Sequence, residues 1–191
     1  MKTIYILLTK STSVTSHIIG RFTSDPYTHS SIAFDDKLTT MYSFARRYSH
    51  LPLPAGLVEE KFDRGFLKSQ GNIPCALLKL DVPDLIHETA QKNIERMLCH
   101  KKHYRYSILG LLACKLHIPL EFHDKYFCSQ FVAKVLADSK AVTLPKMSAL
   151  MRPSDFLSMN CFTQIYNGGL LELKSLCSSP FPWNSAVIET A

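Results

Sequence analysis

The sequence predicts an α+β fold in which a helix beginning near Cys128 packs on a small antiparallel sheet. Segments with strand-like patterns fill the first half of the chain, and segments with helical spacing follow Pro83. The chain has 191 residues, 46% of them hydrophobic, which suits one domain with a sizeable core. We therefore expect a single domain over residues 1–175 and a C-terminal tail, 176–191, without a clear element.

The predicted elements follow from local patterns. Apolar or alternating residues, which are typical of strands, occupy 3–8, 26–35, 39–46, 57–62 and 73–81. Apolar residues three or four apart predict helices over about 84–100, 107–116 and 125–136, and a short helix near 11–20. Pro and Gly predict a loop at 50–56. Residues 152–157 are predicted to form a loop that opens a short helix. Residues 167–169 are predicted to form the turn of a hairpin between strands 162–166 and 170–173.

Cys128 lies in the first turn of the helix predicted over 125–136. Asp124 is a candidate N-cap, and Phe127, Phe131 and Val135 form a stripe that should be buried. A thiol at a helix N-terminus lies at the positive end of the helix dipole, which favours the nucleophilic thiolate. A buried cysteine can equally be a small apolar residue of the core.

A cysteine nucleophile needs a general base, usually a histidine, and a polar group that orients the base. Of the eight histidines, His29 is best placed, because it starts an alternating strand on a face of small residues. It can also be a half-exposed residue that bonds to the backbone. His117 and His123, which precede the Cys128 helix, are the second choice, and His17 is predicted at the surface.

Ser43 and Tyr126 are further candidates for the site. If the turn between the strands at 26–35 and 39–46 comprises three residues, Ser43 lies opposite His29 and is the candidate orienter of its ring. A two-residue turn removes that contact, and Ser43 is then a small packing residue. Tyr126, close to the start of the helix, either points its hydroxyl into the site or packs in the core.

Metal and cofactor chemistry has little support in the sequence. Cys99 and His103 are four apart, but zinc needs about four ligands and no second spaced pair is present, so we expect no metal and no cofactor. Phosphate-binding, dinucleotide-binding and serine-hydrolase motifs are absent. The six cysteines form no C-x-x-C pair, and the apolar run 4–8 is too short for a signal peptide, so a soluble cytoplasmic protein with free thiols is expected.

The net charge of +6 suits an anionic partner such as a membrane surface, a nucleic acid or an acidic substrate. The densest basic run, 101–105, lacks the aromatic and basic repeat that binds nucleic acid, so no nucleic-acid partner is expected. Most of the charge is consistent with a solvated surface, and a membrane surface stays an alternative partner.

Four segments, taken together, resemble the circularly permuted NlpC-type papain-like hydrolases, the group that includes YiiX-like and YebB-like proteins. They are 27–34, 41–46, 126–132 and 152–155, in this order, within a resemblance that covers about residues 1–160. The resemblance implies a papain-like α+β fold with Cys128 as nucleophile and His29 as base. Members generally carry a third polar residue, often an acid, on the strand after the histidine strand. Ser43 is at that position here.

The expected function is therefore that of a cysteine peptidase or amidase acting on a small peptide-, amide- or acyl-containing substrate. His29 would take the proton of Cys128, and the thiolate would attack the carbonyl to form an acyl-enzyme. Tyr126 and the backbone N–H of Cys128 would bind the substrate and its oxyanion. The alternatives are a lipid-directed acyltransferase or thioesterase, suggested by the charge and the apolar run 108–113, and a catalytically silent binding module, suggested by the missing acid.

Overall fold

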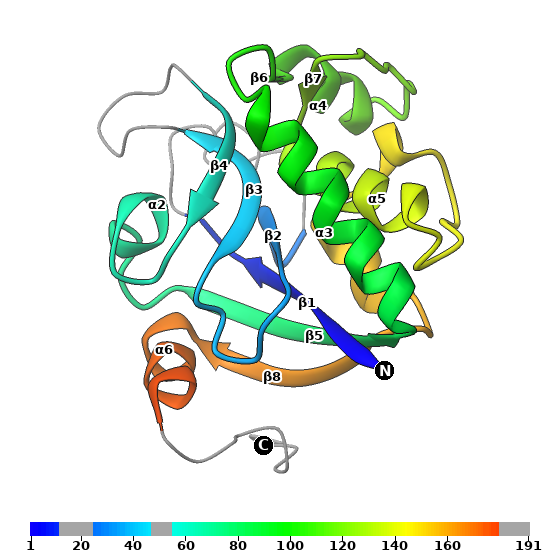
Figure 1. Cartoon of the computed structure of the whole chain (residues 1–191). Helices are drawn as coiled ribbons and strands as arrows, with labels where there is room; N and C mark the ends of the chain where they lie inside the picture. Colours follow the sequence, from blue (N-terminus) through cyan, green and yellow to red (C-terminus); the bar gives the residue numbers. More distant parts are fainter. Residues whose placement is uncertain (12–24, 47–54, 180–191) are drawn as a thin grey trace.

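The computed structural model describes residues 1–11, 25–46 and 55–179. These residues form a mixed α+β structure around a six-stranded antiparallel sheet of order β4-β3-β2-β1-β5-β8 (Figure 1). The strands of this sheet are β1 (Lys2–Thr9), β2 (His29–Ala33), β3 (Met41–Arg46), β4 (Ala55–Glu60), β5 (Pro74–Val82) and β8 (Thr163–Gly169). A separate parallel pair consists of β6 (Arg105–Tyr106) and β7 (Lys125–Tyr126).

Helices lie on both sides of the sheet. They are α2 (Gly65–Lys68), α3 (Asp84–Cys99), α4 (Ile108–Lys115), α5 (Cys128–Asp138) and α6 (Leu170–Ser178), with 3-10 turns η1 (Ser148–Leu150) and η2 (Pro153–Ser158). In Figure 1, α3 and α5 lie together on one side of the strands, and α2 and α6 lie together on the other. The predicted α+β class and antiparallel sheet are thus confirmed.

The central strand β1 supplies two cores because its side chains alternate between the faces of the sheet. Ile4 and Ile6 pack in a cluster that contains residues of α3 and α5. Tyr5 and Leu7 pack in a second cluster, which contains residues of α2 and α6. A strand covered on both faces has no polar side, which explains why residues 4–8 are apolar.

The alternation predicted for β2 and β3 is confirmed, but their register is not. Ile32 pairs with Tyr42, and Ala33 pairs with Met41, which is two residues away from the predicted pairing. An offset of two keeps every side chain on its predicted face, so Ser43 still shares a face with His29.

The three-residue turn behind that predicted register is also wrong, since residues 34–40 connect the two strands. The Asp35 carboxylate accepts hydrogen bonds from the backbone N–H and the hydroxyl of Thr39, at 3.0 and 2.9 Å. Leu38 adopts a positive φ of 50° within this turn. The side chain of Asp35 therefore stabilises a connection longer than the sequence pattern suggested.

The Cys128 helix begins later than predicted. Its N-cap is Phe127, whose side chain makes no capping hydrogen bond, so the predicted cap at Asp124 is wrong. The carbonyl of Asp124 instead accepts from the backbone N–H of Arg105, at 2.9 Å, where β7 meets β6. Cys128 is consequently the first residue of the helix.

The predicted hairpin at 162–173 is wrong. Residues 163–169 form a single strand, β8, beside β5, and α6 follows directly. Asn72 lies against Gly169: its side-chain oxygen accepts from the backbone N–H of Leu171, at 3.1 Å, and lies 2.4 Å from where a Cβ on Gly169 would be. Gly169 therefore permits a close approach and does not form a turn.

Three other predicted segments lie partly or mostly outside the residues that the structure describes. The helix near 11–20 and most of the loop at 50–56 lie outside the described residues, although Ala55 and Gly56 already belong to β4. The tail expected from residue 176 is helical to Ser178 in α6, and its part from 180 onward is also outside the described residues. No helix in the described ranges has the length and apolar character needed to cross a membrane.

The contact between Gly169 and Asn72 yields a test of this part of the fold. We expect Gly169→Ala to lower the free energy of unfolding by about 1–3 kcal/mol, because the new methyl group displaces the Asn72 side chain. Asn72→Ala removes the obstacle, so adding Gly169→Ala to that variant should be less damaging. Urea unfolding of the two single variants and the double variant measures the coupling. Additive effects would contradict the close approach.

Candidate active site

The structure brings Cys128 and His29 together, although 98 residues separate them along the chain. The Cys128 thiol and the His29 ring lie close enough that each shifts the pKa of the other. Both are buried, with 3% of Cys128 and 6% of His29 exposed. Cys128 is the first residue of α5 and His29 is the first residue of β2, so both sit on regular elements that hold them in place.

The site forms where β2 and β3 part. These strands pair only at Ile32 and Ala33 of β2, and α5 contacts both of them. The Ser43 hydroxyl spans the separation by donating to the Ser30 carbonyl, at 2.9 Å. The start of α5 meets this point, and the backbone groups of Ser30 and Ser129 near the Cys128 sulfur help to lower its pKa.

A carboxylate that the sequence analysis missed lies against His29. Glu60 is at the end of β4, and its two oxygens are 3.0 and 3.2 Å from Nε2 of His29. Only 2% of the Glu60 side chain is exposed, and the Ser31 hydroxyl donates to its Oε2 at 2.5 Å. β4 is two strands away from β2 in the sheet, so this contact depends on the sheet order. A pair of acids at 59–60 in a predicted strand is a signal that one of them faces inward.

Ser43 is at the site, but it is not the principal partner of the ring. Its hydroxyl oxygen is 3.4 Å from Nε2 of His29, farther than either Glu60 oxygen, and its hydrogen goes to the Ser30 carbonyl. The orienting position that the sequence suggested for Ser43 is therefore occupied by Glu60.

The charges of the three groups depend on one another. Burial lowers the pKa of His29, but the charge of Glu60 and hydrogen bonds from Glu60 and Cys128 outweigh it and raise that pKa from 6.5 to about 10. Burial raises the pKa of Cys128, but the hydrogen bond and charge of His29 outweigh it, so the pKa is lowered from 9.0. Both shifts favour a thiolate and imidazolium pair near neutral pH.

Tyr106 is a second residue that the sequence analysis missed. The parallel pairing of β6 and β7 places it beside Tyr126, two residues before Cys128. Burial raises the pKa of Tyr106 well above its usual range, and the nearby Cys128 thiolate raises it further. The phenol therefore stays protonated and can donate a hydrogen bond near the sulfur. Two-residue strands have no periodic pattern, so the sequence carries little signal for this placement.

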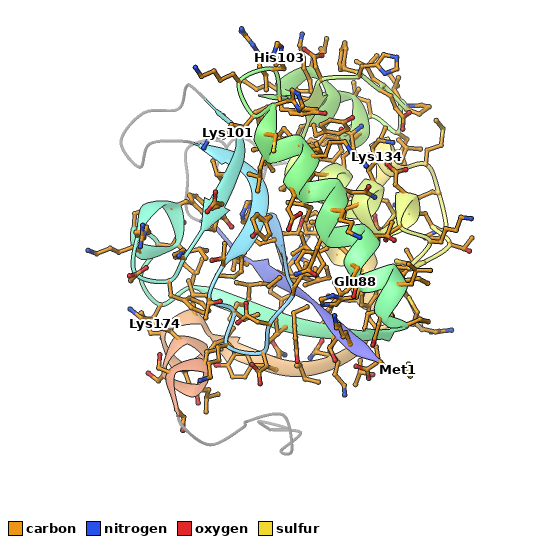
Figure 2. All side chains as sticks on the ribbon, in the orientation of Figure 1. Met1, Glu88, Lys101, His103, Lys134 and Lys174 are labelled. Carbon is orange, nitrogen blue, oxygen red and sulfur yellow. The ribbon has the colours of Figure 1, made fainter. Side chains whose placement is uncertain are left out.

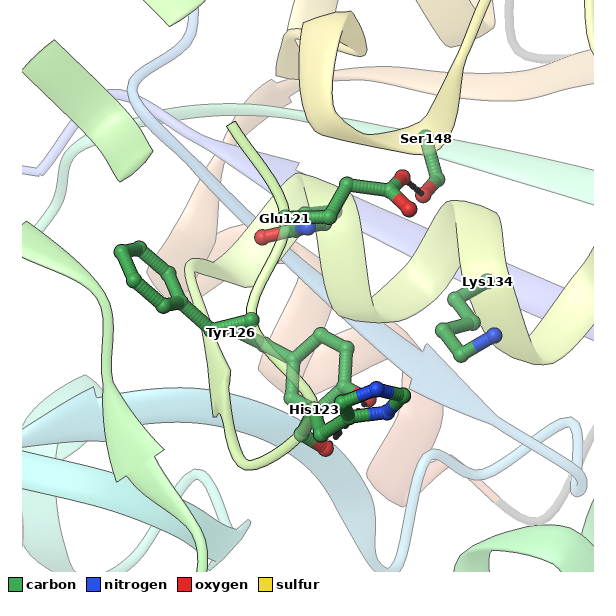
Figure 3. A pocket seen from close by; sticks show the side chains of 7 residues that line it. Glu121, His123, Tyr126, Lys134 and Ser148 are labelled. Atoms are coloured by element: carbon green, nitrogen blue, oxygen red, sulfur yellow. Dashed lines mark hydrogen bonds between the residues drawn. The ribbon is translucent and has the colours of Figure 1, made fainter. Parts of the chain in front are cut away.

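Of the two placements predicted for Tyr126, the structure shows packing in the core. Its hydroxyl donates to the backbone carbonyl of His123, at 3.0 Å, and its ring packs on Phe44 with centroids 5.4 Å apart. Tyr126 and His123 line a separate pocket of about 200 Å³ together with Glu121 and Lys134 (Figure 3). His123, one of the second-choice bases, therefore belongs to that pocket. His117, the other, is exposed after the end of α4.

The Cys128 sulfur lies beside a pocket of its own. Lys115 and Arg152 line it with Asp25, whose carboxylate is 3.5 Å from an Arg152 nitrogen. Its apolar walls come from α4, from the segment before β2 and from the residue before Cys128, namely Leu111, Tyr27 and Phe127. The pocket thus offers a partly apolar surface with a charged rim next to the nucleophile.

Metal ligands do not gather at this site or elsewhere in the described residues. No group of three or more His, Cys, Asp or Glu side chains within residues 1–11, 25–46 and 55–179 is arranged to hold a metal ion. Cys99 and His103, the pair singled out in the sequence, are both exposed at the end of α3 and just beyond it.

The coupling between Glu60 and Cys128 can be tested through thiol reactivity. We expect Glu60→Gln to lower the pKa of His29 and raise that of Cys128, so that alkylation of Cys128 by iodoacetamide requires a higher pH. The measurement is the alkylation rate of the Cys128 peptide against pH, followed by mass spectrometry, with the exposed Cys99 as internal reference. Ser43→Ala is the matched control and should shift the profile less. A profile that Glu60→Gln leaves unchanged would contradict the coupling.

Comparison with known proteins assigns no family to this arrangement. No family model matches the chain, and no curated protein or solved structure matches it either.

Proposed function

We propose that this protein is a cysteine hydrolase of papain-like architecture that cleaves an amide bond, as a peptidase or amidase does. The observation that carries the proposal is the buried chain of contacts from Glu60 through His29 to Cys128. Covalent acyl transfer requires a nucleophile, a base beside it and a third group that orients the base. The raised pKa of His29, next to the Cys128 pocket, supports the same proposal.

In the proposed reaction, the Cys128 thiolate attacks the amide carbonyl carbon to form a tetrahedral intermediate. The His29 imidazolium donates its proton to the amide nitrogen, the carbon–nitrogen bond breaks, and an amine leaves. The enzyme is then an acyl-thioester with neutral His29. His29 takes a proton from water, the resulting hydroxide attacks the thioester, and the carboxylic acid product leaves as the thiolate and imidazolium pair reforms.

Glu60 and Tyr106 have separate roles in this proposal. Glu60 holds the ring of His29 and stabilises its positive charge before the proton is given away. The oxyanion would be held by the backbone N–H of Cys128, which as the first residue of a helix has no intrahelical partner, and by the hydroxyl of Tyr106. Tyr106 takes the place that the sequence suggested for Tyr126, whose hydroxyl is bonded to a carbonyl.

A lipid-directed acyltransferase or thioesterase is the second candidate. Leu111 and Lys115 of α4 line the pocket beside Cys128, and the same helix exposes large apolar side chains. An acyl thioester on Cys128 can pass to a lipid amine or hydroxyl as readily as to water. The alternative of a catalytically silent binding module was suggested by the lack of an acid at the site. Glu60 supplies such an acid beside His29, so that reason no longer holds.

The reaction class can be tested with a panel of short peptides and acylated amino-acid amides, together with acyl thioesters. Product analysis by mass spectrometry distinguishes amide hydrolysis from thioester hydrolysis. Hydrolysis of an amide by the purified protein, lost in Cys128→Ala, is the expected result. Thioester cleavage without amide cleavage would favour the second candidate. Cleavage by Cys128→Ala at the rate of the parent protein would overturn both.

The role of His29 gives a quantitative prediction. We expect His29→Ala to slow hydrolysis by about 10²–10⁴-fold, because general acid and base transfer is lost at both steps. The matched control is His103→Ala, which removes an exposed imidazole outside the site and should leave the rate unchanged. With p-nitrophenyl acetate as substrate, the burst and steady-state phases separate acylation from deacylation. Equal rates for the two variants would exclude His29 as the base.

A further inference from the structure

Large apolar side chains gather at the surface on α4 and just after it. We define the α4 apolar face as Ile108, Leu109, Leu112, Leu116 and Ile118, which are 48%, 61%, 44%, 71% and 53% exposed. Elsewhere in the described residues, exposed large apolar side chains are dispersed along the sequence, as at Met1, Leu85 and Leu171. Single exposed apolar residues are ordinary, but a contiguous group of five marks an interaction surface.

The way α4 packs makes this exposure unusual. The buried residues of the helix are the small Gly110, Ala113 and Cys114. A Cβ on Gly110 would meet the side chain of Ser107, the N-cap of the helix, and would lie at ordinary contact distance, 3.6 Å, from the Leu120 carbonyl oxygen. An ordinary surface helix buries its large apolar residues, and α4 turns them outward. Packing within the chain therefore does not explain them.

The charged side chains of the segment that carries this face have a single sign, although Asp25 of another segment lies near Lys115 at the Cys128 pocket. Between residues 101 and 118 the charged side chains are Lys101, Lys102, Arg105 and Lys115, and no Asp or Glu occurs in the segment. Figure 1 places α4, β6 and β7 at one end of the molecule, and Figure 2 labels Lys101 and His103 at that end. The next acids, Glu121 and Asp124, come after the face in the sequence.

We propose that the α4 apolar face docks on an anionic lipid bilayer, with its aliphatic side chains among the acyl chains and the neighbouring cations at the headgroups. Aliphatic residues beside Lys and Arg are what a helix lying in the interface of a membrane needs. Protein interfaces instead favour aromatic residues and disfavour Lys. A second copy of this chain would bring the same cations against one another, which opposes self-association through this face.

Docking in this way would place the Cys128 pocket next to the bilayer. Leu111, Cys114 and Lys115, on α4 itself, line that pocket. The proposal does not depend on catalysis, because binding requires only the exposed residues of α4 and the cations around them. Cys128→Ala should therefore bind membranes as the parent protein does, and a failure of one proposal can be told from a failure of the other.

Co-sedimentation of the full chain with vesicles tests the docking. The vesicles contain either phosphatidylcholine alone or phosphatidylcholine and phosphatidylglycerol in equal amounts. We expect the parent protein to bind the mixed vesicles more tightly and to release them as salt is raised. Leu109→Asp/Leu116→Asp should weaken binding at least about tenfold. Leu85→Asp/Leu171→Asp, at exposed sites on α3 and α6, is the matched control and should bind like the parent.

Lys101→Glu/Lys102→Glu should reduce binding to the mixed vesicles while leaving the weak binding to phosphatidylcholine unchanged. Circular dichroism checks the fold of each variant, and Leu109→Ser/Leu116→Ser replaces the double Asp variant if that one unfolds. Absence of binding by the parent protein, or equal binding by the α4 and control variants, would overturn the proposal. A dimer of the parent protein that dissociates in the α4 variant would assign the face to a second copy instead.

Discussion

The contact between the buried carboxylate of Glu60 and the ring of His29 is the interaction on which the candidate site depends. A carboxylate with 2% of its side chain exposed needs charged or hydrogen-bonding partners, and His29 and Ser31 provide them. The carboxylate keeps a proton on His29, and the charged ring in turn favours the thiolate of Cys128. Burial alone would raise the pKa of Cys128, so its lowered pKa comes from these neighbours.

The sheet supplies the rigidity that this arrangement needs. β4, β3 and β2 are adjacent, so Glu60 and His29 are held on strands whose spacing is set by backbone hydrogen bonds. The separation of β2 from β3 beyond Ile32 creates the place where the start of α5 meets the sheet. Side chains held by regular elements are positioned more accurately than side chains on loops, which favours a site for chemistry over a chance cluster.

The helix α4 connects this site to the surface. Its buried side is made of small residues, and the helix forms part of the pocket beside Cys128. Its outer side carries large aliphatic residues among cations. If this face docks on a bilayer, the pocket opens close to the membrane, and substrates that carry an acyl chain become accessible to either candidate reaction.

The sequence by itself determined several elements with strong local patterns, and it singled out two residues of the candidate site. Periodicity located β1, β3, β5 and α3, and residue type together with position singled out Cys128 and His29. Only the tertiary structure decided the neighbours of these residues: Glu60 reaches His29 across two strands, and Tyr106 approaches Cys128 through a two-residue strand pair. Local patterns record which face a side chain occupies, whereas contacts between distant strands depend on strand order and register, which no single segment encodes.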